Sequence, residues 1–217
     1  MARAGVDVRQ VERAGRDVLV LDGQELKVSR EAPDGSLPSS DSRDTALLAA
    51  LGNVDRFAAS PGRLWAVSAG TVKSLRWPAA EGAASLLLGS AVMDVAGDDQ
   101  RALVALGAQG VAVVEVAPSG QLRRVATLPV NASTVALAGP LAVAGGATSF
   151  SVFALEDGGA PLLVGTVPTA GAVQRIRLEG RLALVSEGAA GVELWHLPEG
   201  QPFTRKAQLA GMGASDA

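Results

Sequence analysis

The strongest constraint on the fold is a unit of short apolar strands that recurs along the chain. In Val173–Leu197, three runs of alternating apolar and polar residues are separated by a charged turn and a glycine-bearing turn. Alternation with a period of two places every second side chain on one face, which is typical of a β-strand. The same order of strands and turns returns in Val92–Val116 and Val8–Val28. We therefore expect one supersecondary unit that is used several times.

The spacing of these units predicts the architecture. The third strands end at positions about 40 residues apart, a period that is typical of β-propeller blades when each repeat holds four strands. A fourth apolar segment follows each of these ends, which are Trp77, Val116, Leu155 and Leu197. We predict an all-β fold in a single domain of residues 1–217, either a five-bladed β-propeller or a segment of a larger one. The predicted four-stranded antiparallel blades are residues 5–52, 53–90, 91–129, 130–168 and 169–211.

One segment gives conflicting signals. Thr45–Leu51 is rich in Ala and Leu, which favours a helix by intrinsic propensity. Its position in the repeat is that of a fourth strand, and we expect a strand there.

Composition supports sheets that pack closely and excludes several kinds of site. Hydrophobic residues make up 48% of the chain but aromatic residues only 3%, so Val, Leu and Ala must fill the core. The absence of cysteine excludes disulfides, thiol catalysis and Cys-ligated zinc, and His196 is the only histidine, so a multi-His metal centre is also excluded. We expect no cofactor and no metal. The net charge of −3, without a basic cluster, argues against a nucleic-acid partner.

The first residues of the chain contain no apolar segment as long as a signal peptide or a membrane span requires. We therefore expect no membrane span and no signal peptide in the chain as given.

A column of residues on the first strands of the blades is the first candidate site. Just before an apolar residue that we expect to be buried (Val11, Phe57, Val95, Val135 and Ile176), each unit carries a mostly polar residue: Gln10, Arg56, Asp94, Thr134 and Arg175. The innermost strands of a propeller surround its axis, so we expect this column to point toward a central channel. There it would either solvate a water-filled channel or bind a ligand.

Loops at one rim are the second candidate site. The connections between the second and third strands contain glycine and small polar residues, and Glu187 lies in the last of them. Loops that a rigid scaffold holds are where binding residues concentrate. The predicted rim loops are Asp22–Gly23, Ala69–Gly70, Gly107–Gly110, Gly145–Ser149 and Ser186–Gly191.

Two stretches resemble a known repeat. Residues 99–129 contain the step Val113-Val114-Glu115-Val116 before a proline-bearing turn, and residues 179–210 contain Val192-Glu193-Leu194-Trp195 in the same place. Both are similar to the LVIVD repeat of bacterial β-propeller proteins, although their turns lack that repeat's Asp-Pro step. The resemblance implies a propeller with a surface or extracytoplasmic role in binding or assembly and with no shared reaction. A chain outside that context would be cytoplasmic, so the sequence leaves the compartment open.

The sequence therefore favours a non-catalytic binding or scaffolding module that presents rim loops to a protein or other macromolecule. We expect no catalytic residues, because no nucleophile, phosphate-binding or dinucleotide-binding motif is present. Two alternatives stay open. One is a hydrolytic enzyme with a site at the channel mouth, formed by Asp94 with Arg56 and Arg175. The other is a structural fragment of a larger LVIVD-type surface protein.

Overall fold

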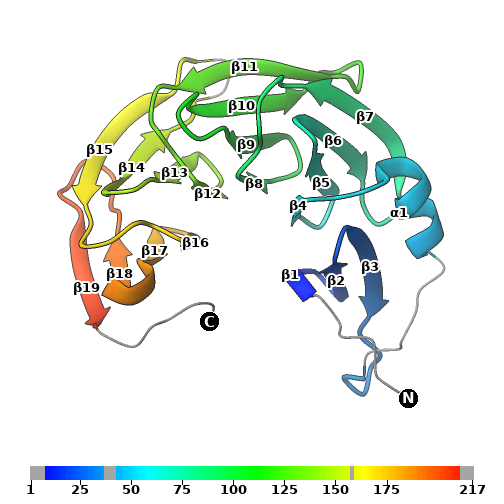
Figure 1. The fold of residues 1–217 in the computed structure, drawn as a ribbon, viewed down its shortest axis with the longest axis horizontal. Helices are drawn as coiled ribbons and strands as arrows, with labels where there is room; N and C mark the ends of the chain where they lie inside the picture. Colours follow the sequence, from blue (N-terminus) through cyan, green and yellow to red (C-terminus); the bar gives the residue numbers. More distant parts are fainter. Residues whose placement is uncertain (1–7, 37–42, 157–158, 211–217) are drawn as a thin grey trace. The chain divides into compact units, whose positions relative to one another are not determined.

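The predicted strand units are antiparallel sheets in the computed structural model, which describes residues 8–36, 43–156 and 159–210. Four sheets contain four strands and one contains three, and neighbouring strands in each sheet follow one another in the sequence (Figure 1). This confirms the predicted order of four antiparallel strands in the second to fifth blades and of the first three strands in the first blade. Residues 5–7 and 211 of the predicted boundaries lie outside the described residues.

The elements are numbered along the chain, and each sheet is called a blade. Blade 1 contains β1 (Val8–Ala14), β2 (Asp17–Asp22) and β3 (Glu25–Arg30), followed by the helix α1 (Arg43–Leu51). Blade 2 contains β4 (Arg56–Ala59), β5 (Arg63–Ser68), β6 (Thr71–Arg76) and β7 (Glu81–Leu87). Blade 3 contains β8 (Asp94–Gly97), β9 (Arg101–Ala105), β10 (Val111–Val116) and β11 (Leu122–Leu128). Blade 4 contains β12 (Thr134–Ala138), β13 (Leu141–Gly145), β14 (Ser149–Ala154) and β15 (Leu162–Pro168). Blade 5 contains β16 (Arg175–Glu179), β17 (Leu182–Ser186), a 3-10 turn (Gly188–Ala190), β18 (Val192–His196) and β19 (Thr204–Leu209).

The chain forms two compact units, each with its own apolar packing. Unit 1 comprises Met1–Ser90, Gly97–Gln100 and Val116–Arg123, and unit 2 comprises Ala91–Ala96, Arg101–Glu115 and Arg124–Ala217. Blades 1 and 2 therefore belong to unit 1 and blades 4 and 5 to unit 2, while blade 3 contributes residues to both.

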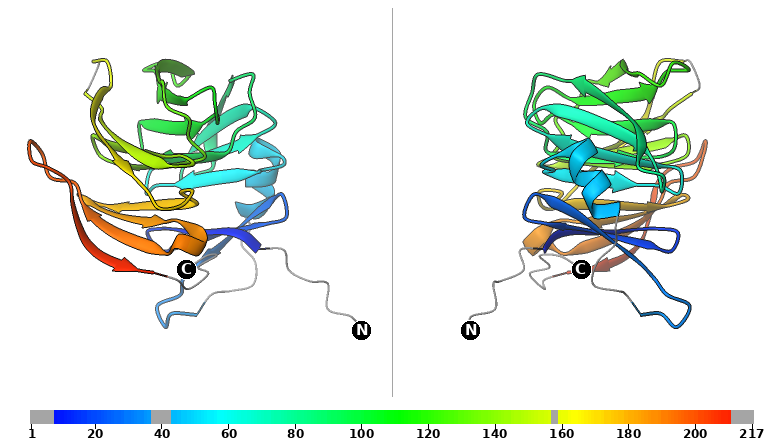
Figure 2. Two further views of the ribbon diagram at one scale, coloured as in Figure 1. Left: turned by 60° about the vertical axis from the view of Figure 1, so that its left-hand side comes forward. Right: turned by 90° about the vertical axis from the view of Figure 1, so that its right-hand side faces the viewer.

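The segment after β3 is a helix, so the predicted fourth strand at Thr45–Leu51 is wrong. α1 contacts β3 and β7, and Figure 2 shows it in cyan at the front of the right-hand view. Leu47 and Leu51 are four residues apart and therefore lie on one helix face, and each is only 1% exposed in the core of unit 1. The Ala and Leu content gives this segment high helix propensity, and one apolar stripe is enough to cover the blade edge.

In unit 2 the blades pack face to face, and β13 shows how one strand contributes to two interfaces. Ala142 and Ala144 belong to a cluster with residues of blade 3, whereas Leu141 and Val143 belong to a cluster with residues of blade 5. All five residues of β13 are buried. A strand that is covered on both faces has no solvent side, which explains why its sequence is continuously apolar instead of alternating.

In unit 1 a tryptophan lies directly against a glycine. The Trp65 side chain is fully buried, and its Nε1–H donates a hydrogen bond of 2.7 Å to the carbonyl oxygen of Asp98. A Cβ atom at Gly97 would lie 2.5 Å from Cδ1 of Trp65. Interiors are packed too tightly to absorb such an overlap, so the indole occupies the space that a side chain at position 97 would need.

We expect Gly97→Ala to lower the free energy of unfolding by about 1–3 kcal/mol, the usual cost of adding a group to a filled core. The measurement is urea unfolding followed by tryptophan fluorescence and circular dichroism. The double variant Gly97→Ala with Trp65→Val has room for the methyl group, so the alanine should cost little in that background. An equal cost of the alanine in both backgrounds would show that the clash with Trp65 is not its cause.

Candidate binding rim

Backbone hydrogen bonds link the strand connections at one end of unit 2. Gly107 forms an antiparallel bridge with Ala132. Farther along, the Val173 N–H donates to the carbonyl oxygen of Gly146 at 2.9 Å, and the Thr169 N–H donates to that of Thr148 at 3.0 Å. Bonded in this way, the connections hold one another in place. We call this surface, formed by residues 106–110, 129–133, 146–148, 169–174 and 187–191, the unit 2 rim.

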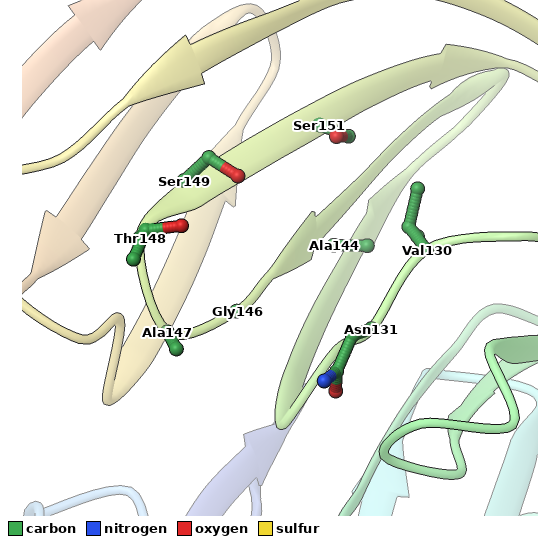
Figure 3. A pocket seen from close by; sticks show the side chains of 8 residues that line it. All are labelled: Val130, Asn131, Ala144, Gly146, Ala147, Thr148, Ser149 and Ser151. Atoms are coloured by element: carbon green, nitrogen blue, oxygen red, sulfur yellow. The ribbon is translucent and has the colours of Figure 1, made fainter.

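A small hollow opens on this rim, as Figure 3 shows. Its volume is about 230 Å³, and Asn131 and Val130 line it on one side, across from Thr148 and Ser149 on the other. The remaining lining residues are Ala144, Gly146, Ala147 and Ser151. The hollow therefore offers amide and hydroxyl groups with no charged side chain among its lining.

Glu187 is a buried carboxylate within this rim. It is 4% exposed, and its Oε2 accepts hydrogen bonds from the backbone N–H groups of Ala170 at 2.9 Å and Gly171 at 3.1 Å. The other oxygen, Oε1, is buried without a hydrogen-bond partner among the residues that the structure describes. Glu187 thus joins the connection after β17 to the connection after β15.

A second buried carboxylate, Glu193 on β18, lies beside it. Its two oxygens accept hydrogen bonds from Trp195 Nε1 at 2.8 Å and from Arg205 Nη1 at 2.6 Å, and the latter is also an ion pair. Burial raises the pKa of Glu187 above its usual value and the charge of Glu193 raises it further, while the amides of Gly171 and Ala170 act in the opposite direction. Burial thus disfavours the charged form of Glu187.

The predicted column residues Gln10 and Asp94 are engaged with the innermost strand of the next blade. In unit 1, Gln10 Nε2 donates to the carbonyl oxygen of Phe57 at 2.6 Å, and its Oε1 accepts from the Phe57 N–H at 3.2 Å. In unit 2, Asp94 Oδ2 accepts from Thr134 Oγ1 at 2.8 Å and from the Val135 N–H at 3.0 Å. These side chains replace a strand partner for the next blade, which explains a polar residue at this position of the repeat.

The other column residues lie in different surroundings. Thr134 is buried and serves as the donor to Asp94, whereas Arg175 is half-buried. Arg56 is exposed and donates to the backbone oxygen of Asp55. The column is thus not one uniform polar surface.

The expectation that Val11 is buried, like its equivalents, is wrong. Val11 is 47% exposed, whereas the equivalent residues are at most 5% exposed: Phe57, Val95, Val135 and Ile176. The face of blade 1 that carries Val11 is opposite the one that packs in the unit 1 core.

Comparison with known proteins identifies the fold. No family model matches the sequence, and no curated protein matches it. A chain of similar structure is the β-propeller domain of Myceliophteria thermophila Cps50 (Swd1), at 11% identity and a TM-score of 0.71, over 96% of this chain and 73% of that one. The fold is a β-propeller.

Two further solved structures of similar fold extend the comparison. The computationally designed Ika8 protein is 14% identical with a TM-score of 0.66, and 95% of this chain is covered. A chain of the Mitotic Checkpoint Complex is 13% identical with a TM-score of 0.66, over 96% of this chain and 66% of that one. The 217-residue chain spans 63% of the length of Ika8. At such identities the likeness concerns the fold alone.

The rest of the described propeller offers few other chemical centres. Within residues 8–36, 43–156 and 159–210, three or more His, Asp or Glu side chains never gather as a metal site would require. In this part of the chain, no helix has both the length and the apolar content that a membrane crossing requires.

Part of this rim was predictable from the sequence. The loop at 145–149 and Glu187 were named from the repeat, and both belong to the rim or the hollow. Asn131 and Glu193 were missed as site residues. The signal for Glu193 is its place on β18, where the register sets it opposite Val185, a residue of the core between blades 4 and 5. A carboxylate at a core position calls for a partner, which here is Arg205.

Asp94→Asn is expected to lower the free energy of unfolding by about 1–3 kcal/mol, because hydrogen bonds to a charged group are lost. In the aspartate, Oδ2 accepts from Thr134 and Val135 while Oδ1 accepts from the Val95 N–H at 2.9 Å. An asparagine must turn its NH₂ group toward one of these donors. Urea unfolding measures the effect, and the control is Asp34→Asn, which changes an exposed carboxylate that accepts hydrogen bonds from the nearby Ser36. A neutral result would show that the carboxylate does not tie blade 3 to blade 4.

The titration of Glu187 should be visible in the pH dependence of the free energy of unfolding. A glutamate in the unfolded chain has a pKa of about 4.3. Because folding raises the pKa of Glu187, its contribution to stability is fully present below that pH and is lost as the pH rises through the folded-state pKa. Glu187→Gln should not titrate, so the stability of the variant relative to the wild type should rise as the pH rises through this window.

The measurement is the difference between the wild-type and variant free energies of unfolding. It is made from about pH 4 to about pH 8, a range that starts near the ordinary pKa of glutamate and extends above it. Glu199→Gln is the control, because the Glu199 side chain is 86% exposed where it pairs with Arg181. A difference for Glu187→Gln that is constant over the whole range would show that Glu187 does not titrate with folding.

Proposed function

We propose that this β-propeller is a non-catalytic binding or scaffolding module that docks the unit 2 rim onto a protein partner. The observation that supports the proposal is the rim itself, where neighbouring connections are bonded to one another around a polar hollow. A surface that is already ordered loses little conformational freedom when it binds, so more of the contact energy appears as affinity.

The chemistry of the hollow supports a polypeptide as the partner. Its lining of Asn131, Thr148, Ser149 and Ser151 with small apolar residues offers neutral donors and acceptors. These match backbone amides and uncharged polar side chains. A volume of about 230 Å³ is below the roughly 300–1,000 Å³ of ordinary small-molecule pockets. The hollow is thus better suited to one side chain of a larger partner than to a free metabolite.

The hydrolytic alternative gains no support from the column residues. A catalytic carboxylate must be free to reach substrate, and Asp94 uses both oxygens in hydrogen bonds to Val95, Thr134 and Val135. The structure of the Mitotic Checkpoint Complex contains a chain of similar fold, and that chain belongs to a protein assembly. Both points favour binding over catalysis.

A matched pair of substitutions tests the proposal. Asn131→Arg places a long cation in the hollow, and Gln201→Arg places the same cation in the exposed turn between β18 and β19. Peptides selected from a random phage library against the purified protein are the probes, and fluorescence polarisation measures their dissociation constants. We expect Asn131→Arg to weaken binding at least tenfold, about 1.4 kcal/mol, with Gln201→Arg unchanged.

Equal affinities for both variants would refute the rim as the binding surface. The proposal would also be contradicted if none of the selected peptides competed with one another for a single binding surface. Circular dichroism of both variants ensures that any loss of binding is not loss of fold.

A further inference from the structure

Blade 5 of unit 2 has one packed face and one exposed apolar face. Ala183 and Val185 of β17 pack against blade 4, whereas Leu182 and Leu184, which alternate with them on the same strand, are 41% and 44% exposed. The register continues this exposed face onto the neighbouring strands, and Figure 2 shows β19, in red, at the outer edge of this sheet in its left-hand view. We call it the blade 5 open face: Arg177, Leu182, Leu184, Val192, Leu194 and Leu209.

Blade 4 shows what such a face contacts in this protein. Leu141 begins β13 as Leu182 begins β17, and Val143 corresponds to Leu184. Leu141 and Val143 are 7% and 0% exposed because they pack in one cluster with residues of blade 5. The face of a blade that is equivalent to the blade 5 open face is thus covered by the opposite face of another blade.

Blade 1 of unit 1 carries an exposed face of that opposite kind. Val11 is 47% exposed, and its equivalent Ile176 is 5% exposed because it packs against blade 4. Val8 of the same strand is 49% exposed, and Val18 and Val20, which pair with this strand, are half-buried. The blade 1 open face consists of Val11, Val18 and Val20, and the register places Arg13 and Lys27 beside them on the same face.

We propose that the blade 5 open face of one copy of this chain binds the blade 1 open face of a second copy, head to tail. The chain itself supplies both halves of a contact that it already forms between blades 4 and 5. The second copy would therefore place apolar side chains at the same positions of the repeat as the contact between blades 4 and 5. A contact between two different surfaces of identical chains is heterologous, and it produces a closed ring or an open series of copies.

This inference concerns the faces of the blades and does not rest on the proposed function of the rim. The residues of the two open faces lie on strands, whereas the unit 2 rim consists of connections between strands. Either proposal can therefore fail without the other.

Complementation between two variants tests the proposal. Size-exclusion chromatography with light scattering should give assemblies of the wild type at multiples of 21.8 kDa that grow with concentration. Leu184→Arg and Val11→Arg each place a charged side chain on one open face, so each variant alone should be a monomer. Mixed together they retain one intact face of each kind, and the mixture should form a one-to-one dimer of twice 21.8 kDa.

The control is Leu163→Arg on β15, a residue that is 52% exposed and lies outside both open faces, and it should assemble like the wild type. A wild type that stays monomeric at every concentration, as closure within one chain would give, overturns the proposal. Assembly that Leu184→Arg abolishes but Val11→Arg leaves intact also overturns it, because it indicates a symmetric contact between two blade 5 faces. Leu182→Arg replaces Leu184→Arg if circular dichroism shows that the latter has lost its sheet structure.

Discussion

The structure depends on covering both faces of thin apolar sheets. A four-stranded blade has little interior of its own, so its side chains reach a dry environment only where a second sheet lies against them. In unit 2 this requirement acts on single strands: the five consecutive residues of β13 are all buried, because alternate residues belong to different clusters. Large side chains would hold such sheets apart, which accounts for the small share of aromatic residues. Where an aromatic ring does enter, as Trp65 does in unit 1, a glycine opposite it supplies the space.

Polar side chains contribute to the same packing at the innermost strands. These strands are sheet edges, whose backbone groups lack a strand partner on one side. The amide of Gln10 bonds both backbone groups of Phe57, and the carboxylate of Asp94 takes the N–H of Val135 together with the hydroxyl of Thr134. An unmet backbone group costs more in the interior than at the surface. A polar residue at this place in the repeat therefore has a structural reason that does not involve a ligand.

The repeat made most of the fold predictable, and its failures have local causes. Strand order followed from the period of apolar runs, because alternation and turn residues act over a few positions and need no tertiary information. The predicted strand at Thr45–Leu51 is wrong because helix propensity outweighed the position in the repeat. One apolar stripe on a helix was enough to cover the edge of the blade there. The predicted burial of Val11 is wrong for a different reason. Whether a blade face is buried depends on a neighbouring sheet, which the sequence of the strand itself does not specify. The proximity of Glu187 to Glu193 was equally beyond sequence, because it arises from two positions brought together across a turn.

These two carboxylates show how the packing of the blades reaches the rim. Glu193 is held by hydrogen bonds from Trp195 and Arg205. Trp195 itself packs edge-on against Phe150 of blade 4, with 5.8 Å between the ring centroids. Glu187 lies between this buried group and the backbone of Ala170 and Gly171, so it transmits the position of the core to the connection above it. That connection is in turn bonded to Thr148 beside the hollow through Thr169. A chain of hydrogen bonds therefore leads from the buried Glu187 to the strand connection that borders the hollow.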